Sequence, residues 1–143
     1  MSENTRSIDL TRVAQNHYRA EAPSGASVEF GSGEGLMTPV ELLLAAIAGC
    51  SSIDVDTVTS RRTEPTRFTV KAAGEKLDED GASRLEAIEL SFDITFLNDA
   101  DGQRAKDRVE KLVTLSHDKY CTVSRTVEHG TPVSFHILDS GDD

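Results

Sequence analysis

The chain has 143 residues, with 25 acidic and 15 basic side chains and a formal net charge of −10. This length suits one ordinary domain, which can bury a core without disulfide bonds. The negative charge argues against nucleic acid and anionic membranes as partners, because binding to phosphate depends on neutralising cations. No apolar stretch approaches the roughly 20 residues that span a bilayer, so we expect a cytoplasmic protein without a membrane partner.

The first 30 residues contain three short segments typical of β-strands, at 8–10, 18–20 and 28–30. Turn-forming residues separate these segments, which predicts a small antiparallel meander. The glycine-rich segment 31–35 follows, and no Gly-Lys-Ser/Thr sequence closes it as in a phosphate-binding loop. We therefore expect this segment to act as a hinge or a lid.

A helix start is predicted where Thr38, Pro39 and Glu41 follow one another. Thr38 suits the N-cap, Pro39 suits the first helical position, and Glu41 completes a capping box. Apolar residues occupy every side of the helix over 42–48, so we expect a helix that is buried all round and that carries Cys50. Such a helix is too apolar for a small monomer to cover, which predicts a dimer.

Two alternating segments, 66–75 and 84–96, predict a long hairpin whose turn lies in the acidic segment between them. Leu85 and Ile88 are out of phase along the second segment. A bulge near Ala87 is therefore needed to keep both side chains on the core face.

The C-terminal third predicts two helices and a strand. An amphipathic helix follows from Gly102, and a second, short helix over 122–128 places Cys121 at its start. Val133, Phe135 and Ile137 alternate with polar residues as a closing strand is expected to do. With no internal repeat and no linker, we predict a single α+β domain over 1–143.

Two cysteines, Cys50 and Cys121, are separated by about half of the chain. This spacing matches neither a Cys-x-x-Cys redox loop nor a structural zinc site, so any pairing must be tertiary. Lys119 and Arg125 flank Cys121, and a helix start can stabilise a thiolate. The alternatives are a small buried hydrophobic residue for each cysteine, or a metal site with His117, for which no fourth ligand is evident.

A reactive thiol needs a cation or hydrogen-bond donors nearby, because an ordinary thiol is only about 3% ionised at neutral pH. On the helix, Asp54 lies about 40° from Cys50. Its carboxylate could orient an arginine that also serves the thiolate. Arg19 on an N-terminal strand and Arg125 are the candidates, and the alternative for each is a surface position.

Segments 38–55 and 115–124 resemble the OsmC/Ohr family, the osmotically induced and organic hydroperoxide resistance proteins. The resemblance implies an OsmC-like fold, in which antiparallel sheets pack around a central buried Cys-bearing helix within an intertwined homodimer. Where the hydroperoxide resistance branch carries a glutamate after the helix-starting proline, this chain has Val40. It is therefore similar to the OsmC-like branch, in which Asp54 would take over that role.

The resemblance also implies a thiol-dependent peroxidase that reduces organic hydroperoxides, and hydrogen peroxide less well. Cys50 would become a sulfenic acid, Cys121 would resolve it as a disulfide, and an external dithiol would reduce that disulfide. No cofactor and no metal are expected. The expected catalytic residues are Cys50, Cys121, Arg19 and Asp54. The alternative is a non-enzymatic dimeric protein that binds a small molecule or senses redox state.

Overall fold

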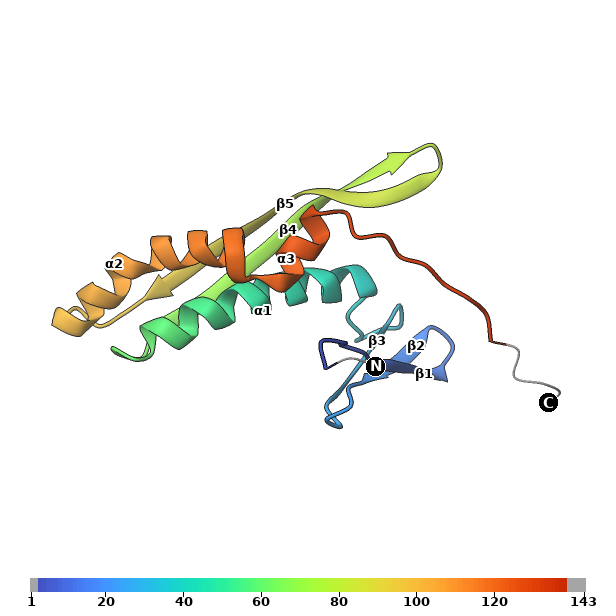
Figure 1. Cartoon of the computed structure of the whole chain (residues 1–143), viewed down its shortest axis with the longest axis horizontal. Helices are drawn as coiled ribbons and strands as arrows, with labels where there is room; N and C mark the ends of the chain where they lie inside the picture. The colour runs from blue at the N-terminus through green and yellow to red at the C-terminus, as the bar shows by residue number, and fades with distance from the viewer. Residues whose placement is uncertain (1–2, 139–143) are drawn as a thin grey trace. The chain divides into compact units, whose positions relative to one another are not determined.

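The computed structural model describes residues 3–138, which form an α+β structure with antiparallel sheets and three α-helices (Figure 1). The chain divides into two compact units. The first contains Met1–Ala48 and Lys71–Ser91, and the second contains Gly49–Val70 and Phe92–Asp143. Both cysteines therefore belong to the second unit.

The predicted N-terminal meander is confirmed. Strands β1 (Asp9–Ala14), β2 (His17–Glu21) and β3 (Ser27–Gly31) form an antiparallel sheet in the order β1-β2-β3. A Cβ atom at Gly31 would lie 2.0 Å from the carbonyl oxygen of Asn16. The end of β3 therefore requires glycine, because this close backbone approach leaves no room for a side chain.

Helix α1 (Pro39–Thr59) begins at the predicted residue and carries the predicted capping box. The Thr38 backbone N–H donates to Glu41 Oε1 at 2.9 Å, and the Glu41 N–H donates to Thr38 Oγ1 at 3.2 Å. These reciprocal bonds satisfy two groups that the first turn of a helix otherwise leaves unpaired.

The expectation that α1 is buried all round is wrong for the single chain. Its buried residues form one stripe at a spacing of four residues, namely Ile47, Ser51, Val55 and Thr59. Large apolar side chains of the helix remain exposed, namely Val40 and Leu43 near its start and Ile53 on another face. The reason is that one chain packs against one face of the helix only.

Among the described residues, helix α1 is long and apolar enough to cross a membrane, judged by length and composition. This finding corrects the expectation that no apolar stretch approaches that length. A core helix of a soluble protein meets the same criterion. The criterion alone therefore does not distinguish between the two kinds of helix.

The predicted hairpin is formed by β4 (Arg67–Glu79) and β5 (Ala82–Thr95). Asp80 and Gly81 join the strands with φ values of 49° and 84°, as in a type I′ turn. Ala87 has a φ of 52°, a left-handed conformation at the position where the bulge is predicted.

The side chains beside this bulge lie where the prediction places them. A Cβ atom at Gly74 would lie 3.1 Å from Cγ1 of Ile88 and 3.5 Å from Cδ1 of Leu85. Leu85 and Ile88 therefore share one face of the hairpin, although they are three residues apart.

The N-cap of helix α2 (Ala100–Leu115) is Asp99, whose Oδ1 accepts the Gly102 N–H at 2.7 Å. A π-helical turn, η1 (Ser116–Tyr120), follows α2 directly. Helix α3 (Thr122–Glu128) has the predicted bounds, and Cys121 is its N-cap. The turn η1 was not predicted, because the amphipathic stripe of α2 runs on into Ser116 without interruption.

The predicted closing strand is wrong for the single chain. Residues 131–138 form no strand, and Val133, Phe135 and Ile137 are 93%, 88% and 89% exposed. The alternating pattern is that of a strand, but within the described chain no sheet edge pairs with it.

Candidate active site

The thiols of Cys50 and Cys121 interact directly in the second unit. The half-buried Cys50 lies in α1, close enough to Cys121 that each thiol shifts the pKa of the other. Both are free thiols, and the Cys121 side chain is 0% exposed. The tertiary proximity that the spacing required is therefore present, and it places a half-buried thiol beside a fully buried one.

Hydrogen-bond donors converge on both sulfur atoms. Hydrogen bonding from the backbone N–H groups of Val123 and Thr122, in the first turn of α3, acts to lower the pKa of Cys50. The Ser124 N–H donates to Cys121 Sγ at 3.4 Å, and the Ser124 hydroxyl lies 3.1 Å from the same sulfur. The Cys121 side chain thus acts as the N-cap of α3 in place of the usual oxygen.

These surroundings shift the two thiols in opposite directions. Burial raises the pKa of Cys50, the donated N–H of Val123 opposes that shift, and the neighbouring Cys121 raises the pKa further. Burial also acts to raise the pKa of Cys121, but hydrogen bonds from Ser124, Ser51 and Cys50 outweigh it and lower the pKa below its ordinary value. The surroundings thus favour the thiolate form more at Cys121 than at Cys50.

Asp54 lies one helical turn beyond Cys50 and contacts the segment that leads to Cys121. Its Oδ2 accepts a hydrogen bond from the Ser116 hydroxyl at 2.6 Å. Ser116 is 0% exposed, and its carbonyl accepts the Cys121 N–H at 2.7 Å across η1. Asp54 thus reaches Cys121 through two successive hydrogen bonds.

The two candidate arginines have different partners. Arg19 lies on β2 in the first unit, and its Nε is 3.7 Å from Oε2 of Glu29, the residue opposite on β3. Arg125 donates to the carbonyl of Asp118 at 3.2 Å, so it ties α3 to η1. The role of Arg19 at Cys50 stays a prediction.

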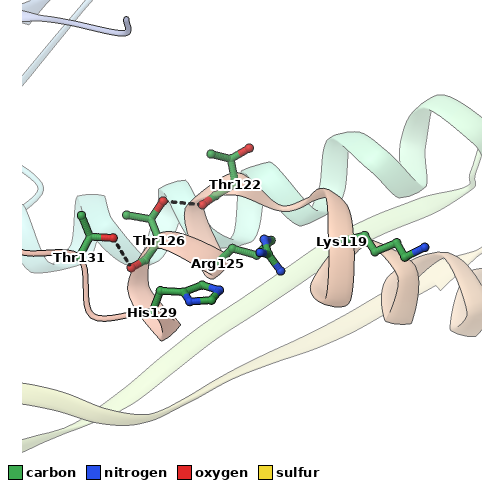
Figure 2. A pocket seen from close by; sticks show the side chains of 6 residues that line it. All are labelled: Lys119, Thr122, Arg125, Thr126, His129 and Thr131. Atoms are coloured by element: carbon green, nitrogen blue, oxygen red, sulfur yellow. Dashed lines mark hydrogen bonds between the residues drawn. The ribbon is translucent and has the colours of Figure 1, made fainter. Parts of the chain in front are cut away.

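A pocket of about 300 Å³ lies over η1, α3 and the residues just beyond α3 (Figure 2). It is lined by Lys119, Thr122, Arg125, Thr126, His129 and Thr131. Figure 2 shows the side chains of Thr126 and Thr131 bonded to backbone carbonyls, of Thr122 and Thr126 respectively. The pocket thus combines cationic groups with threonines in a chain that is otherwise strongly acidic.

His117 does not join the cysteines in a metal site. Its Nδ1 lies 3.0 Å from Asp118 Oδ1, and its Nε2 lies 2.7 Å from Glu128 Oε1. The hydrogen bond with Asp118 and the charge of Glu128 raise the pKa of His117. No group of three or more His, Cys, Asp or Glu side chains in residues 3–138 is arranged to hold a metal ion.

Sequence reasoning missed three serines that touch the site. Ser51 follows Cys50 directly, and Ser124 stands three residues after the N-cap, where a capping partner is expected, so both carried a local signal. Ser116 carried none, because its partner Asp54 is distant in the sequence.

The fold and the site define an α+β protein with antiparallel sheets and a pair of free thiols that interact at the start of a short helix. Residues 31–136 match the family described as OsmC-like protein. The chain belongs to this family.

Relatives and solved structures agree with this assignment. An uncharacterized protein of Mycobacterium tuberculosis is 32% identical over 137 residues, which cover 92% of this chain and 96% of the relative. Protein YhfA of Escherichia coli is 32% identical over 122 residues, which cover 82% and 85%.

Two crystal structures share the fold. A hypothetical protein from Aquifex aeolicus superposes with a TM-score of 0.70 at 23% identity, over 90% of each chain. The organic hydroperoxide resistance protein OhrB of Bacillus subtilis superposes with a TM-score of 0.56 at 14% identity, over 85% of this chain and 90% of that one.

Proposed function

We propose that this protein is a Cys-based peroxidase that reduces organic hydroperoxides, with Cys50 as the peroxidatic and Cys121 as the resolving cysteine. The observation that carries the proposal is the direct interaction of two free thiols, of which Cys50 is the more exposed. A peroxide can approach a half-buried sulfur, whereas a sulfur that is 0% exposed is reached only through its neighbour. Two solved structures of the same fold are named organic hydroperoxide resistance proteins, which supports peroxide reduction as the proposed reaction.

The closeness of the two thiols supports a specific order of proton transfers. The Cys121 thiolate accepts the proton of Cys50, and the Cys50 thiolate attacks the terminal oxygen of the hydroperoxide. The O–O bond breaks, Cys50 becomes a sulfenic acid, and the leaving alkoxide takes the proton from Cys121. The Cys121 thiolate then attacks the Cys50 sulfur and expels hydroxide. The products are one disulfide, one alcohol and one hydroxide, and an external dithiol restores both thiols by exchange.

Organic hydroperoxides fit this site better than hydrogen peroxide does. The helix that carries Cys50 is apolar, and the alkyl part of an organic hydroperoxide gains free energy when it leaves water. The cycle needs no cofactor, because both electrons come from the thiols. Activation of Cys50 by Arg19 belongs to the same proposal, and so does a cytoplasmic location, where dithiol reductants are present.

The proposal includes an intertwined homodimer in which α1 is central. Exposed apolar side chains of α1 and of the segment after α3 remain uncovered in the single chain. A second copy would bury both surfaces, because contiguous exposed apolar surface marks an interaction site. The exposed residues that would be covered are Val40, Leu43, Ile53, Val133, Phe135 and Ile137.

A thiol count tests the proposed activity. The reduced protein is mixed with one equivalent of an organic hydroperoxide, and free thiols are counted before and after. We expect rapid loss of both thiols, reversal by a dithiol, and a slower reaction with hydrogen peroxide.

Two variants test the assigned roles. Cys50→Ser should lose all turnover, and Cys121→Ser should accumulate a sulfenic acid that a dimedone probe labels at Cys50. Two thiols remaining in the wild-type protein would overturn the proposal and favour a non-enzymatic protein that binds a small molecule.

A further inference from the structure

We propose that Asp54 is a positioning residue, whose hydrogen bond to Ser116 sets the thiol–disulfide equilibrium of the Cys50–Cys121 pair. This inference rests on the proposed function, because it concerns the disulfide of the same cycle. It assigns Asp54 a role through Ser116 rather than through the charge of its carboxylate.

The geometry on α1 makes Asp54 a second contact point beside Cys50. Residues four apart on an α-helix lie about 40° apart around the axis and about 6 Å apart along it. Both side chains therefore face the segment from η1 to α3, as their contacts with Ser116 and Cys121 require. Two contacts one turn apart fix the position of that segment along α1, which a single contact would not do.

The π-helical turn transmits this fixed position to Cys121. Ser116 is the first residue of η1, and its carbonyl accepts the N–H of Cys121 at 2.7 Å. A π-helical turn is uncommon and occurs frequently at functional sites. Here η1 links Ser116, which Asp54 binds, to Cys121, which must form the disulfide with Cys50.

Two other contacts join the parts of this segment to each other. Arg125 donates to the Asp118 carbonyl, and His117 bridges to Glu128. These bonds hold η1 and α3 to each other, whereas the bond between Asp54 and Ser116 holds the segment to α1. Its 2.6 Å length and the complete burial of Ser116 favour a strong hydrogen bond.

A disulfide depends on such positioning because its geometry is narrow. The Cα atoms must lie about 4.4–6.8 Å apart with a defined torsion between the sulfur atoms. If the segment is free to shift along α1, the effective concentration of one thiol at the other falls. The disulfide then becomes less stable relative to the dithiol.

The test is the reduction potential of the full-length protein, measured in glutathione buffers with alkylation and mass analysis as the readout. We expect Ser116→Ala and Asp54→Ala each to lower the equilibrium constant for disulfide formation about tenfold, which is about 30 mV for this two-electron couple. The double variant should show no further change, because both single variants remove the same bond. The double variant removes both the Asp54 carboxylate and the Ser116 hydroxyl, so neither group is left without its partner. It can therefore be tested even if a single variant does not fold.

Two further variants separate positioning from charge. Asp54→Asn keeps an oxygen that can accept from Ser116, so it should restore a potential near that of the wild type. Asp56→Ala is the matched control, because Asp56 accepts a hydrogen bond from Ser60 at 2.8 Å on the exposed side of the same helix. This control should leave the potential unchanged.

Unchanged potentials in Ser116→Ala and Asp54→Ala would overturn the inference while leaving the peroxidase proposal intact. A shift in Asp54→Asn equal to that in Asp54→Ala would also overturn it, since charge would then be the cause. Failure of the wild-type protein to form the disulfide with any oxidant would overturn both proposals together.

Discussion

The exposed segment after α3 offers a direct test of the proposed dimer. Val133, Phe135 and Ile137 project from residues 131–138 and are 93%, 88% and 89% exposed. We consider the triple variant in which all three become serine. Because these side chains contact little of their own chain, the variant should alter association while leaving the folding of each chain almost unchanged.

The expected magnitude follows from these exposures. Fully burying a Val, Phe or Ile side chain contributes about 1.5–3 kcal/mol, so three of them contribute about 5–9 kcal/mol in each chain. A symmetric dimer buries two such segments. If only a small part of this sum, roughly 3 kcal/mol, appears in the net association free energy, the dissociation constant rises about a hundredfold.

Sedimentation velocity over a dilution series measures this change. The wild-type protein should sediment as a dimer, and the triple variant should dissociate within the same concentration range. The matched control replaces Ser134 and His136 with alanine, since these residues alternate with the apolar ones along the segment. A monomeric wild-type protein, or a triple variant that associates as tightly as the control, would refute the reasoning.

Three further predictions concern contacts inside the individual units. Gly102→Ala should lower the free energy of unfolding by more than about 2 kcal/mol in urea titrations, because its Cβ would lie 1.7 Å from the Leu97 carbonyl oxygen; a stable variant would contradict the geometry at the start of α2. Thr38→Ala should cost about 1 kcal/mol in the same assay through loss of the N-cap, and Thr57→Ala, on an exposed part of α1, is its control. His117 should titrate by NMR above 6.5, because its pKa is raised by Asp118 and Glu128. The ion pairs of so exposed a group contribute under about 1 kcal/mol to stability. This contribution is complete below pH 6.5 and is lost as pH rises through the folded-state pKa. The variant His117→Gln should therefore be less stable than the wild type at pH 6 and equally stable at pH 9.

Local signals in the sequence predicted the local structure well. The capping box at Thr38 and Glu41 depends on residues three apart, and the bulge at Ala87 follows from two apolar residues that are out of phase. Both features are decided within a few residues of chain. Sequence patterns describe such features directly, because the forces that form them act between near neighbours.

Predictions that depended on distant partners were less complete. The alternation at Val133 is that of a strand, but a strand also needs a neighbouring edge, which the single chain does not provide. The apolar faces of α1 were read as buried, whereas one chain covers only the stripe that includes Val55. The contact between Asp54 and Ser116 had no sequence signal, because a polar pair on two amphipathic helices reads as ordinary surface.

The unequal surroundings of the two sulfur atoms also predict how the proposed disulfide is reduced. A reductant must reach one sulfur and expel the other as a thiolate, and a thiol of lower pKa leaves faster. Cys50 is half-buried, whereas Cys121 is 0% exposed, and hydrogen bonds from Ser124 and Ser51 act to lower the pKa of Cys121. Both access and leaving ability therefore direct the attack to Cys50.

This reasoning is checked by adding a limiting amount of glutathione to the oxidised protein and mapping the mixed disulfide by mass spectrometry. We expect glutathione on Cys50 and a free thiol on Cys121. In Ser124→Ala, Cys121 loses the side-chain hydrogen bond that acts to lower its pKa, so the first exchange step should slow while the site of attack stays the same. Glutathione found mainly on Cys121 would contradict the prediction. It would show that the reductant attacks the buried sulfur first, although Cys50 is the more exposed of the two in the single chain.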